Sequence, residues 1–235
     1  MNREQEWYYV SLCEQTKRYE EMFEKVLCLL QQCSQVEEHQ VRLLSISYKN
    51  MLSPIHALLR VYKASKALEQ YQKFLQIFHE QEIKIEKELF CIYELFLNLL
   101  EQIIANNDSQ IIFECLSLKR TTLKYLIELE KNEEKKNYYS DQYNTDCFKM
   151  NDIAKNFPPI DPSRLRMALE MSTIYQKAGL IERSYHTAKN AFDTALNALE
   201  KLTADEFAKN SNEISLILNL LKDNMVLCSA PMINE

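Results

Sequence analysis

Glycine is almost missing from this chain of 235 residues, which contains only Gly179. An average chain of this length carries roughly sixteen glycines, at about 7% usage. The chain therefore lacks the glycine-rich loops that cradle nucleotide phosphates and the glycine elbow that presents a catalytic serine. Any phosphate that this protein binds must be held by side chains. Sheet-rich folds also depend on glycine turns, so the shortage favours an all-helical fold.

Proline is scarce too, and acidic residues outnumber basic ones. Of five prolines, only Pro54 falls within the first 157 residues. Lys and Arg number 28 against 34 Asp and Glu, a net charge of −6. Nucleic-acid-binding domains usually carry a basic surplus, so we expect no nucleic-acid partner. The most apolar stretch, 89–105, is interrupted by Glu94 and Glu101 on one helix face, so we expect no membrane insertion.

The residues that usually carry chemistry show no catalytic or metal-binding spacing. The seven cysteines include no CxxC pair, and we expect them to be reduced thiols in the core of a cytoplasmic protein, with nuclear access open to it. The four histidines lie far apart in sequence, and paired glutamates diverge on a helix. We therefore expect no metal, no cofactor and no enzymatic activity.

Apolar residues recur at helical spacing along nearly the whole chain. This pattern predicts a single all-α domain over residues 1–235, with about nine helices that pack as antiparallel neighbours. Helices of about 30 residues would be roughly 45 Å long, which favours an open, layered array. The expected helices run through residues 7–13, 18–32, 37–68, 85–103, 109–127, 139–157, 162–178, 185–202 and 213–229.

Several residues indicate where these helices begin and end. The run 106–109, with Asp108, offers a helix N-cap. The charged run 133–136 is expected to be a solvated turn before the next helix. Asp161 is typical of an N-cap that precedes Pro162 as the first helical residue, and Gly179 is typical of the position just after a helix.

Two segments then identify a family. Residues 43–50, LLSISYKN, and residues 216–224, LILNLLKDN, resemble the two signature segments of the 14-3-3 proteins. Shorter matches lie between and before them, in the same order as in the family. These are Glu14-Gln15 with Arg18-Tyr19, Lys124-Tyr125-Leu126, Pro162 with Arg164-Leu165, and Ala188-Lys189 with Ala191-Phe192-Asp193. The chain thus resembles a divergent 14-3-3 protein along nearly its whole length.

The resemblance implies a cup-shaped homodimer, or a heterodimer with a related chain, whose grooves bind phosphoserine or phosphothreonine segments of partner proteins. The family builds its phosphate pocket from a lysine, two arginines and a tyrosine. The lysine and tyrosine are kept, whereas histidine and lysine stand at the two arginine positions. The implied phosphopeptide-binding residues are Lys49, His56, Arg60, Lys124, Tyr125 and Asn224.

The two lost arginines predict weaker binding. Arginine offers a planar two-pronged donor, whereas lysine is a point charge and histidine is charged only below about pH 6.5. One charged hydrogen bond contributes roughly 1.5–3 kcal/mol, so one lost contact would weaken binding about tenfold to a hundredfold. Pro54 adds a predicted kink, because it removes the helical bond to the Asn50 carbonyl, between Lys49 and His56.

Matching also places a groove wall and a dimer surface. In the groove, Glu170 replaces an asparagine and Lys177 replaces a glutamate. The implied groove residues are Leu169, Glu170, Thr173, Lys177, Leu216, Leu220 and Leu227. The implied dimer residues are Leu12, Cys13, Thr16, Arg18 and Glu21 of one subunit against Leu58, Tyr62, Lys84 and Glu88 of the other. Arg18 with Glu88 and Glu21 with Lys84 would be opposite-charge pairs.

Other interpretations of the same residues remain open. Glu170 could pair with Lys49 and Lys124 and fill the place of the phosphate, which would make the chain a phosphate-independent dimeric scaffold. His56 could be an ordinary surface histidine, and the leucines of the last helix could be core residues. A tetratricopeptide-like solenoid would repeat every 34 residues or so, and we find no such repeat.

Overall fold

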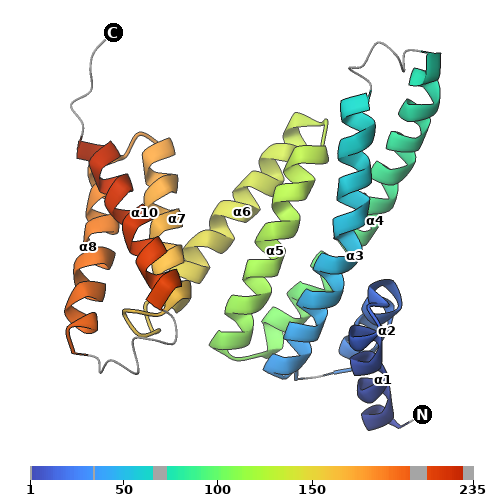
Figure 1. Cartoon of the computed structure of the whole chain (residues 1–235), viewed down its shortest axis with the longest axis horizontal. Coiled ribbons are helices and arrows are strands. Elements are labelled where there is room, and N and C mark those ends of the chain that lie inside the picture. The colour runs from blue at the N-terminus through green and yellow to red at the C-terminus, as the bar shows by residue number, and fades with distance from the viewer. Residues whose placement is uncertain (1, 34, 66–72, 202–210, 230–235) are drawn as a thin grey trace. The chain divides into compact units, whose positions relative to one another are not determined.

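The computed structural model describes residues 2–33, 35–65, 73–201 and 211–229. Within these ranges the chain forms nine α-helices and no strand (Figure 1). The predicted all-α class is therefore confirmed. No helix in this part of the chain is both long and apolar enough to cross a membrane.

The helices fall into two compact units, Met1–Gln142 and Tyr143–Glu235. The first unit contains α1 (Arg3–Gln15), α2 (Tyr19–Gln31), α3 (Glu38–Ser65), α4 (Leu75–Asn106), α5 (Ser109–Leu129) and the start of α6 (Glu133–Ala154). The second contains the rest of α6, with α7 (Pro162–Lys177), α8 (Ile181–Leu199) and α10 (Ser211–Ser229). The single domain remains a prediction, and expected helical residues 66–68 and Leu202 lie outside the described residues.

The predicted helix ends are confirmed where capping chemistry marks them. The Asp108 side chain accepts hydrogen bonds from the backbone N–H groups of Gln110 and Ile111 at the start of α5. The Asp161 side chain accepts hydrogen bonds from the backbone N–H groups of Ser163 and Arg164 at the start of α7, where Pro162 is the first residue. Gly179 has φ +75° just after α7, a left-handed conformation that glycine adopts without a Cβ penalty.

The expected turn at residues 133–136 is wrong, because these residues form the first turn of α6. The Asn132 side chain accepts a hydrogen bond from the Lys135 N–H at 3.1 Å and so caps the helix. Glu133 and Glu134 then lie at the helix N-terminus, where the backbone dipole favours negative charge. Charge in this run therefore stabilises a helix start.

An aromatic cluster forms the centre of the first unit. Tyr48 of α3 stacks on Phe96 of α4 with ring centroids 3.7 Å apart, and Phe23 of α2 packs against both rings. The Tyr48 hydroxyl is also 2.7 Å from the Thr122 hydroxyl of α5, in a fully buried contact. These contacts fix the rotation of α3 about its axis relative to α4 and α5.

The core of the second unit combines aliphatic packing with a buried polar network. One cluster of its buried apolar residues consists of Leu165, Ala188, Ala195, Ile214, Ile217, Leu218 and Leu221. Ser172 of α7 and Ser184 of α8 each donate a hydrogen bond to the other's backbone carbonyl, at 2.9 and 2.7 Å. Reciprocal bonds of this kind satisfy buried hydroxyls and set the register between the two helices.

The cysteine prediction is only partly correct. All seven cysteines are free thiols, but only Cys13, Cys115 and Cys147 are buried. Cys28 and Cys91 are exposed, because they lie on the solvent side of α2 and α4. Burial raises the pKa of the Cys115 thiol to about 12, so this thiol stays protonated at neutral pH.

Pro54 does not interrupt the helix that contains it. α3 continues as one helix from Glu38 to Ser65, with Pro54 inside it. Lys49, His56 and Arg60 lie on this one helix, as predicted. A change of direction at Pro54 remains a prediction.

Replacing Phe96 by Ala should destabilise the first unit by about 3–5 kcal/mol, because it leaves a cavity beside the Tyr48 ring. The neighbouring Leu95 is 45% exposed, so Leu95→Ala should change the free energy of unfolding by about 0.5 kcal/mol or less. Urea unfolding followed by circular dichroism compares the two variants. Equal effects would contradict the assignment of Phe96 to the core.

Candidate functional site

A cavity of about 310 Å³ lies in the first unit and brings together three of the predicted phosphate-binding residues. His56 and Arg60 come from α3, four residues apart and therefore on one helix face, and Tyr125 comes from α5. The rest of the lining consists of Leu59, Lys63, Leu89, Tyr93, Glu128 and Leu129. The sequence prediction had identified none of these six as site residues.

His56 is enclosed by two tyrosines. Its Nε2 atom makes a short hydrogen bond with the Tyr93 hydroxyl, and its ring centroid is 4.2 Å from that of Tyr125. The Tyr93 and Tyr125 rings are stacked, with an interplanar angle of 13°. His56 is therefore part of a packed aromatic group, and its interpretation as an ordinary surface histidine is not supported.

Burial lowers the pKa of His56 from its ordinary value, and the positive charge of Arg60 lowers it further. Burial also raises the pKa of the Tyr93 phenol, which keeps its proton at neutral pH. The imidazole is thus neutral at neutral pH in the unbound chain. Arg60 and Lys63 then supply the permanent positive charge of the cavity, and Glu128 supplies a negative charge.

Lys49 and Lys124 lie on the same two helices but do not line this cavity. Both are exposed. Among the residues that the structure describes, the Lys49 ammonium group has no hydrogen bond or ion pair. It lies next to the buried Tyr48, so the helix turns it outward. The meeting of these two lysines around a phosphate stays a prediction.

Asn224, the sixth predicted contact, points into the core of the second unit. It is only 6% exposed, and its Nδ2 donates a hydrogen bond of 2.7 Å to the Ser172 hydroxyl. The side chain therefore joins α10 to the buried serine pair of α7 and α8. In this conformation its amide N–H is engaged inside the protein.

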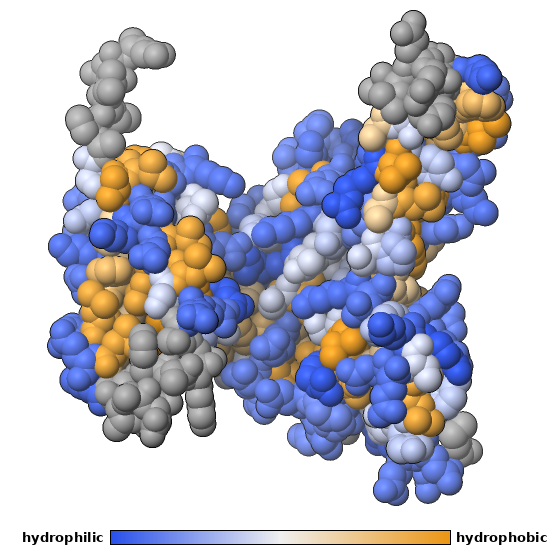
Figure 2. Space-filling model, viewed as in Figure 1, coloured by the Kyte–Doolittle hydropathy of each residue, from blue (hydrophilic) through white to orange (hydrophobic). Residues whose placement is uncertain are grey.

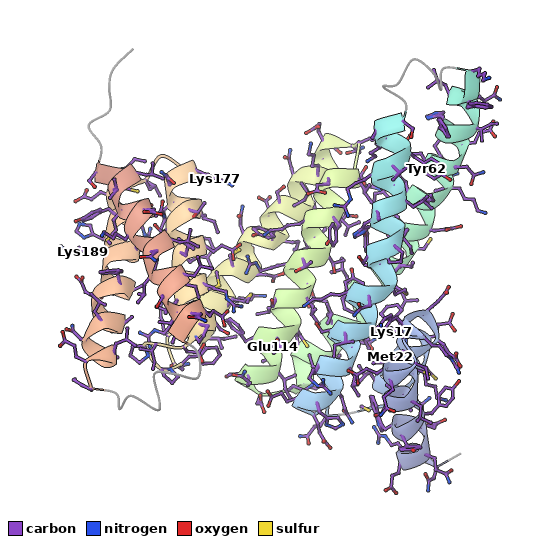
Figure 3. The ribbon with its side chains drawn as sticks, in the orientation of Figure 1. Lys17, Met22, Tyr62, Glu114, Lys177 and Lys189 are labelled. Atoms are coloured by element: carbon purple, nitrogen blue, oxygen red, sulfur yellow. The ribbon has the colours of Figure 1, made fainter. Side chains whose placement is uncertain are left out.

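The predicted groove residues of α7 differ in their surroundings. The Glu170 carboxylate accepts a short hydrogen bond from the Tyr143 hydroxyl of α6. The Thr173 hydroxyl donates to the Leu169 carbonyl at 2.9 Å, one turn earlier on the helix. Lys177 is exposed on the last turn of α7 (Figure 3).

The predicted groove leucines of α10 are on its exposed side. Leu216, Leu220 and Leu227 are 60%, 42% and 65% exposed. The opposite face of the helix carries the core residues, including Ile217 and Leu221. Figure 2 shows hydrophobic surface over this part of the second unit. These leucines are therefore not core residues, and they form an exposed apolar face of α10.

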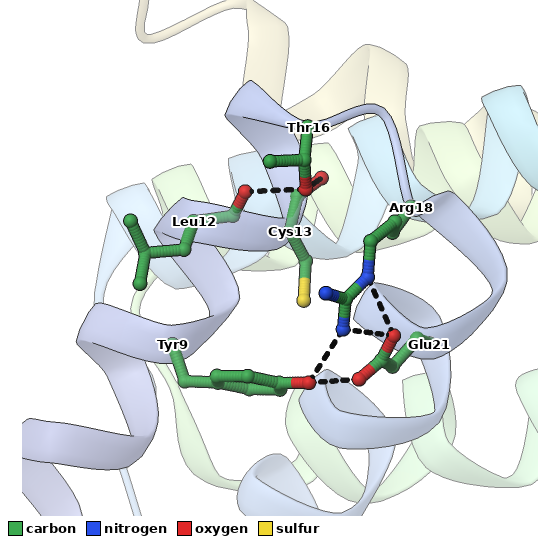
Figure 4. Close-up of polar contacts among 6 residues, drawn as sticks. All are labelled: Tyr9, Leu12, Cys13, Thr16, Arg18 and Glu21. Atoms are coloured by element: carbon green, nitrogen blue, oxygen red, sulfur yellow. Dashed lines mark hydrogen bonds and ion pairs between the residues drawn. The ribbon is translucent and has the colours of Figure 1, made fainter.

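The predicted dimer residues of α1 and α2 form a local polar network (Figure 4). Arg18 Nε donates to the Glu21 carboxylate at 2.7 Å, and Arg18 Nη2 donates to the Tyr9 hydroxyl at 2.7 Å. Tyr9 also makes a short hydrogen bond to Glu21. Arg18 and Glu21, expected to pair with another subunit, thus pair with each other in the isolated chain.

The remaining dimer residues have mixed exposure. Leu12 and Leu58 are 37% and 44% exposed, whereas Cys13 is buried. The Thr16 hydroxyl donates to the Leu12 carbonyl at 2.8 Å. Tyr62 lies against Phe78 of α4 with ring centroids 5.8 Å apart. Lys84 and Glu88 are exposed on α4, and Glu88 lines one cavity with Arg18 and Glu21.

Comparison with known proteins identifies the family. The family model described as "14-3-3 protein" matches residues 9–229. The chain belongs to the 14-3-3 family. The predicted family is therefore confirmed.

Three similar 14-3-3 proteins come from distant organisms. The chain is 30% identical over 224 residues to a 14-3-3-like protein of Fucus vesiculosus, covering 94% of this chain and 88% of the relative. It is 32% identical over 248 residues to 14-3-3-like protein B of Nicotiana tabacum, covering 99% and 93%. It is 29% identical over 237 residues to a 14-3-3 protein of Giardia intestinalis, covering 96% and 92%.

In the described part of the chain, no group of three or more His, Cys, Asp or Glu side chains could hold a metal ion. The cavity around His56 instead offers hydrogen-bond donors with a net positive charge. Such a set suits an anion with several acceptor oxygens.

The titration of His56 tests the geometry of this cavity. We expect nuclear magnetic resonance to place its pKa below about 6.5, the ordinary histidine value. Arg60→Gln should raise that pKa, because it removes the charge but leaves the burial. Because the unfolded chain binds this proton more readily, the His56 contribution to stability should be present above about pH 6.5 and should be lost as the pH falls from there through the lower pKa of the folded chain. A pKa at or above the ordinary value would contradict the buried position.

Proposed function

We propose that this chain is an adaptor that binds phosphoserine or phosphothreonine segments of other proteins, with an atypical and weakened phosphate pocket. Membership of the 14-3-3 family supports the general role. The observation that carries the specific proposal is the cavity in which His56, Arg60 and Tyr125 meet. A guanidinium and a phenol hydroxyl there can donate to phosphate oxygens, and no glycine loop is needed.

The weakness follows from the charge of the same side chains. His56 is neutral until it gains a proton, so it offers the phosphate no permanent charge. Glu128 also lines the cavity and repels a phosphate dianion. Lys49 and Lys124 would add point charges from its edge. Without the two-pronged donor of a second arginine, we expect binding to be about tenfold to a hundredfold weaker.

We also propose that the apolar face of α10 binds apolar side chains of the partner segment. Leu216, Leu220 and Leu227 are separated by four and seven residues and so share one helix face. Their exposure leaves apolar area that a bound segment would remove from water. Leu169, Thr173 and Lys177 of α7 belong to the same proposed groove.

We further propose that the chain works as a dimer, with itself or with a related chain. The exposed Leu12 and Leu58 would supply the apolar contact. Arg18 and Glu21 would exchange their mutual pair for Glu88 and Lys84 of the other subunit. Because exposed ion pairs contribute only about 0–1 kcal/mol each, the leucines would carry most of the stability. We place this adaptor in the cytoplasm, without catalytic activity.

Calorimetry with matched peptides tests the function. A phosphoserine peptide selected from a random library should bind, and its unphosphorylated twin should bind at least about tenfold more weakly. Since a nearby phosphate favours protonated His56, affinity should rise as the pH falls from about 8 to 6.5.

The control for this pH effect is His56→Gln, which should bind with a flat profile over the same range. The range stays above the second phosphate pKa of about 6, so the peptide remains largely dianionic. Equal affinity for the two peptides would contradict phosphate recognition. If the affinity of the unaltered chain for the phosphopeptide did not change with pH over this range, His56 would not contact the phosphate.

A phosphate-independent scaffold is the second candidate, in which the Glu170 carboxylate would occupy the place of the phosphate. This scaffold predicts that Glu170→Asn gives a large gain in affinity for a phosphopeptide, because it removes a competing negative charge. The matched control is Tyr143→Phe, which deletes the hydroxyl that Glu170 accepts from but keeps the charge. If Glu170→Asn leaves phosphopeptide affinity unchanged, the groove is not filled by this residue.

A further inference from the structure

α3 carries a lysine, Lys63, to which the family resemblance gives no role in binding. His56, Arg60 and Lys63 lie at positions i, i+4 and i+7, so they follow one another along the same side of the helix. All three line the cavity that contains Tyr125. Lys63 is therefore the second permanent positive charge on this cavity wall, two helical turns beyond His56.

Lys63 has a loose partner in this structure. Its Nζ atom is 3.7 Å from Glu86 Oε1, and its side chain is 45% exposed. The other oxygen of the same carboxylate, Glu86 Oε2, accepts a hydrogen bond of 3.0 Å from Lys131 Nζ. Glu86 thus has a shorter and better partner than Lys63.

The Lys131 contact allows Lys63 to change partners at little cost. The Glu86 side chain is only 11% exposed, and a nearly buried carboxylate without a counter-charge is costly. Lys131 would remain to neutralise it if Lys63 turned away. The hydrogen bond that Lys131 donates to Glu86 raises the pKa of Lys131, so this lysine stays charged.

We propose that Lys63 binds the phosphate of the peptide together with Arg60 and the Tyr125 hydroxyl, and so compensates for the neutral His56. The inference rests on the proposed function. Arg60 and Lys63 give this wall two positive charges against the single negative charge of Glu128. Ligand phosphate would take the place of Glu86 beside Lys63, and the phosphate subsite would extend toward the C-terminal end of α3.

Two matched variants test the role of Lys63. Lys63→Gln and Lys131→Gln each remove one cation that faces Glu86, but only Lys63 lines the cavity. Calorimetry should show that Lys63→Gln lowers affinity for the selected phosphoserine peptide about tenfold and leaves the unphosphorylated twin unchanged. Lys131→Gln should lower phosphopeptide affinity less than Lys63→Gln does, because it leaves Glu86 to Lys63 but keeps the Lys63 charge on the cavity wall. Lys63→Arg should preserve the affinity.

A fourth variant separates binding from a structural role. Glu86→Gln frees Lys63 from its competing carboxylate, so it should raise phosphopeptide affinity, whereas a merely structural lysine predicts no gain. If the unaltered chain prefers the phosphorylated peptide but Lys63→Gln binds it equally well, the inference is overturned and the proposed function stands. If the unaltered chain does not distinguish the two peptides, the proposed function fails and the inference fails with it.

Discussion

The contact of the His56 ring with Tyr93 and Tyr125 determines the charge of the candidate site. Removing an imidazole from water favours its neutral form, and a neighbouring guanidinium adds to that preference. The Tyr93 and Tyr125 rings stack on each other, and this contact fixes their positions beside His56. The cavity therefore begins with fewer permanent charges than a site built from arginines. Its affinity for an anion depends on which other cations the same helix face presents.

The aromatic core of the first unit determines which residues of α3 lie on the side that faces the cavity. Tyr48 is fixed by stacking on Phe96 and by its contact with the Thr122 hydroxyl. This contact fixes the rotation of α3, so residues eight, twelve and fifteen positions later come to one side of the helix. In a chain with a single glycine, anion recognition must come from such helix faces. The packing of Tyr48 in the core thus determines the side of α3 on which the Arg60 charge lies.

Much of the fold could be predicted because its signals are local. Asp108, Asp161 and Gly179 mark helix ends through bonds to residues within five positions, and the structure confirms all three. The turn predicted at residues 133–136 is wrong because charged residues occur both in solvated turns and at helix N-termini. The capping side chain of Asn132, which decides between the two, was overlooked in the sequence.

The candidate site was less predictable, because its contacts join distant helices. Tyr93 follows the buried Leu89 by four residues, a spacing that could have placed it in the core. No sequence pattern could show that its hydroxyl reaches His56. Asn224 matches a ligand-binding position, yet its amide turns inward because Ser172, 52 residues away, accepts its hydrogen bond. Likewise, Arg18 and Glu21 are satisfied within one chain by a tyrosine from α1.

A crystal structure of the chain with a bound phosphoserine peptide tests the central claim most directly. We expect the phosphate to lie within hydrogen-bond distance of the Arg60 guanidinium and the Tyr125 hydroxyl, beside the His56 ring. Phosphate density elsewhere on the chain, with this cavity left to solvent, would contradict the account.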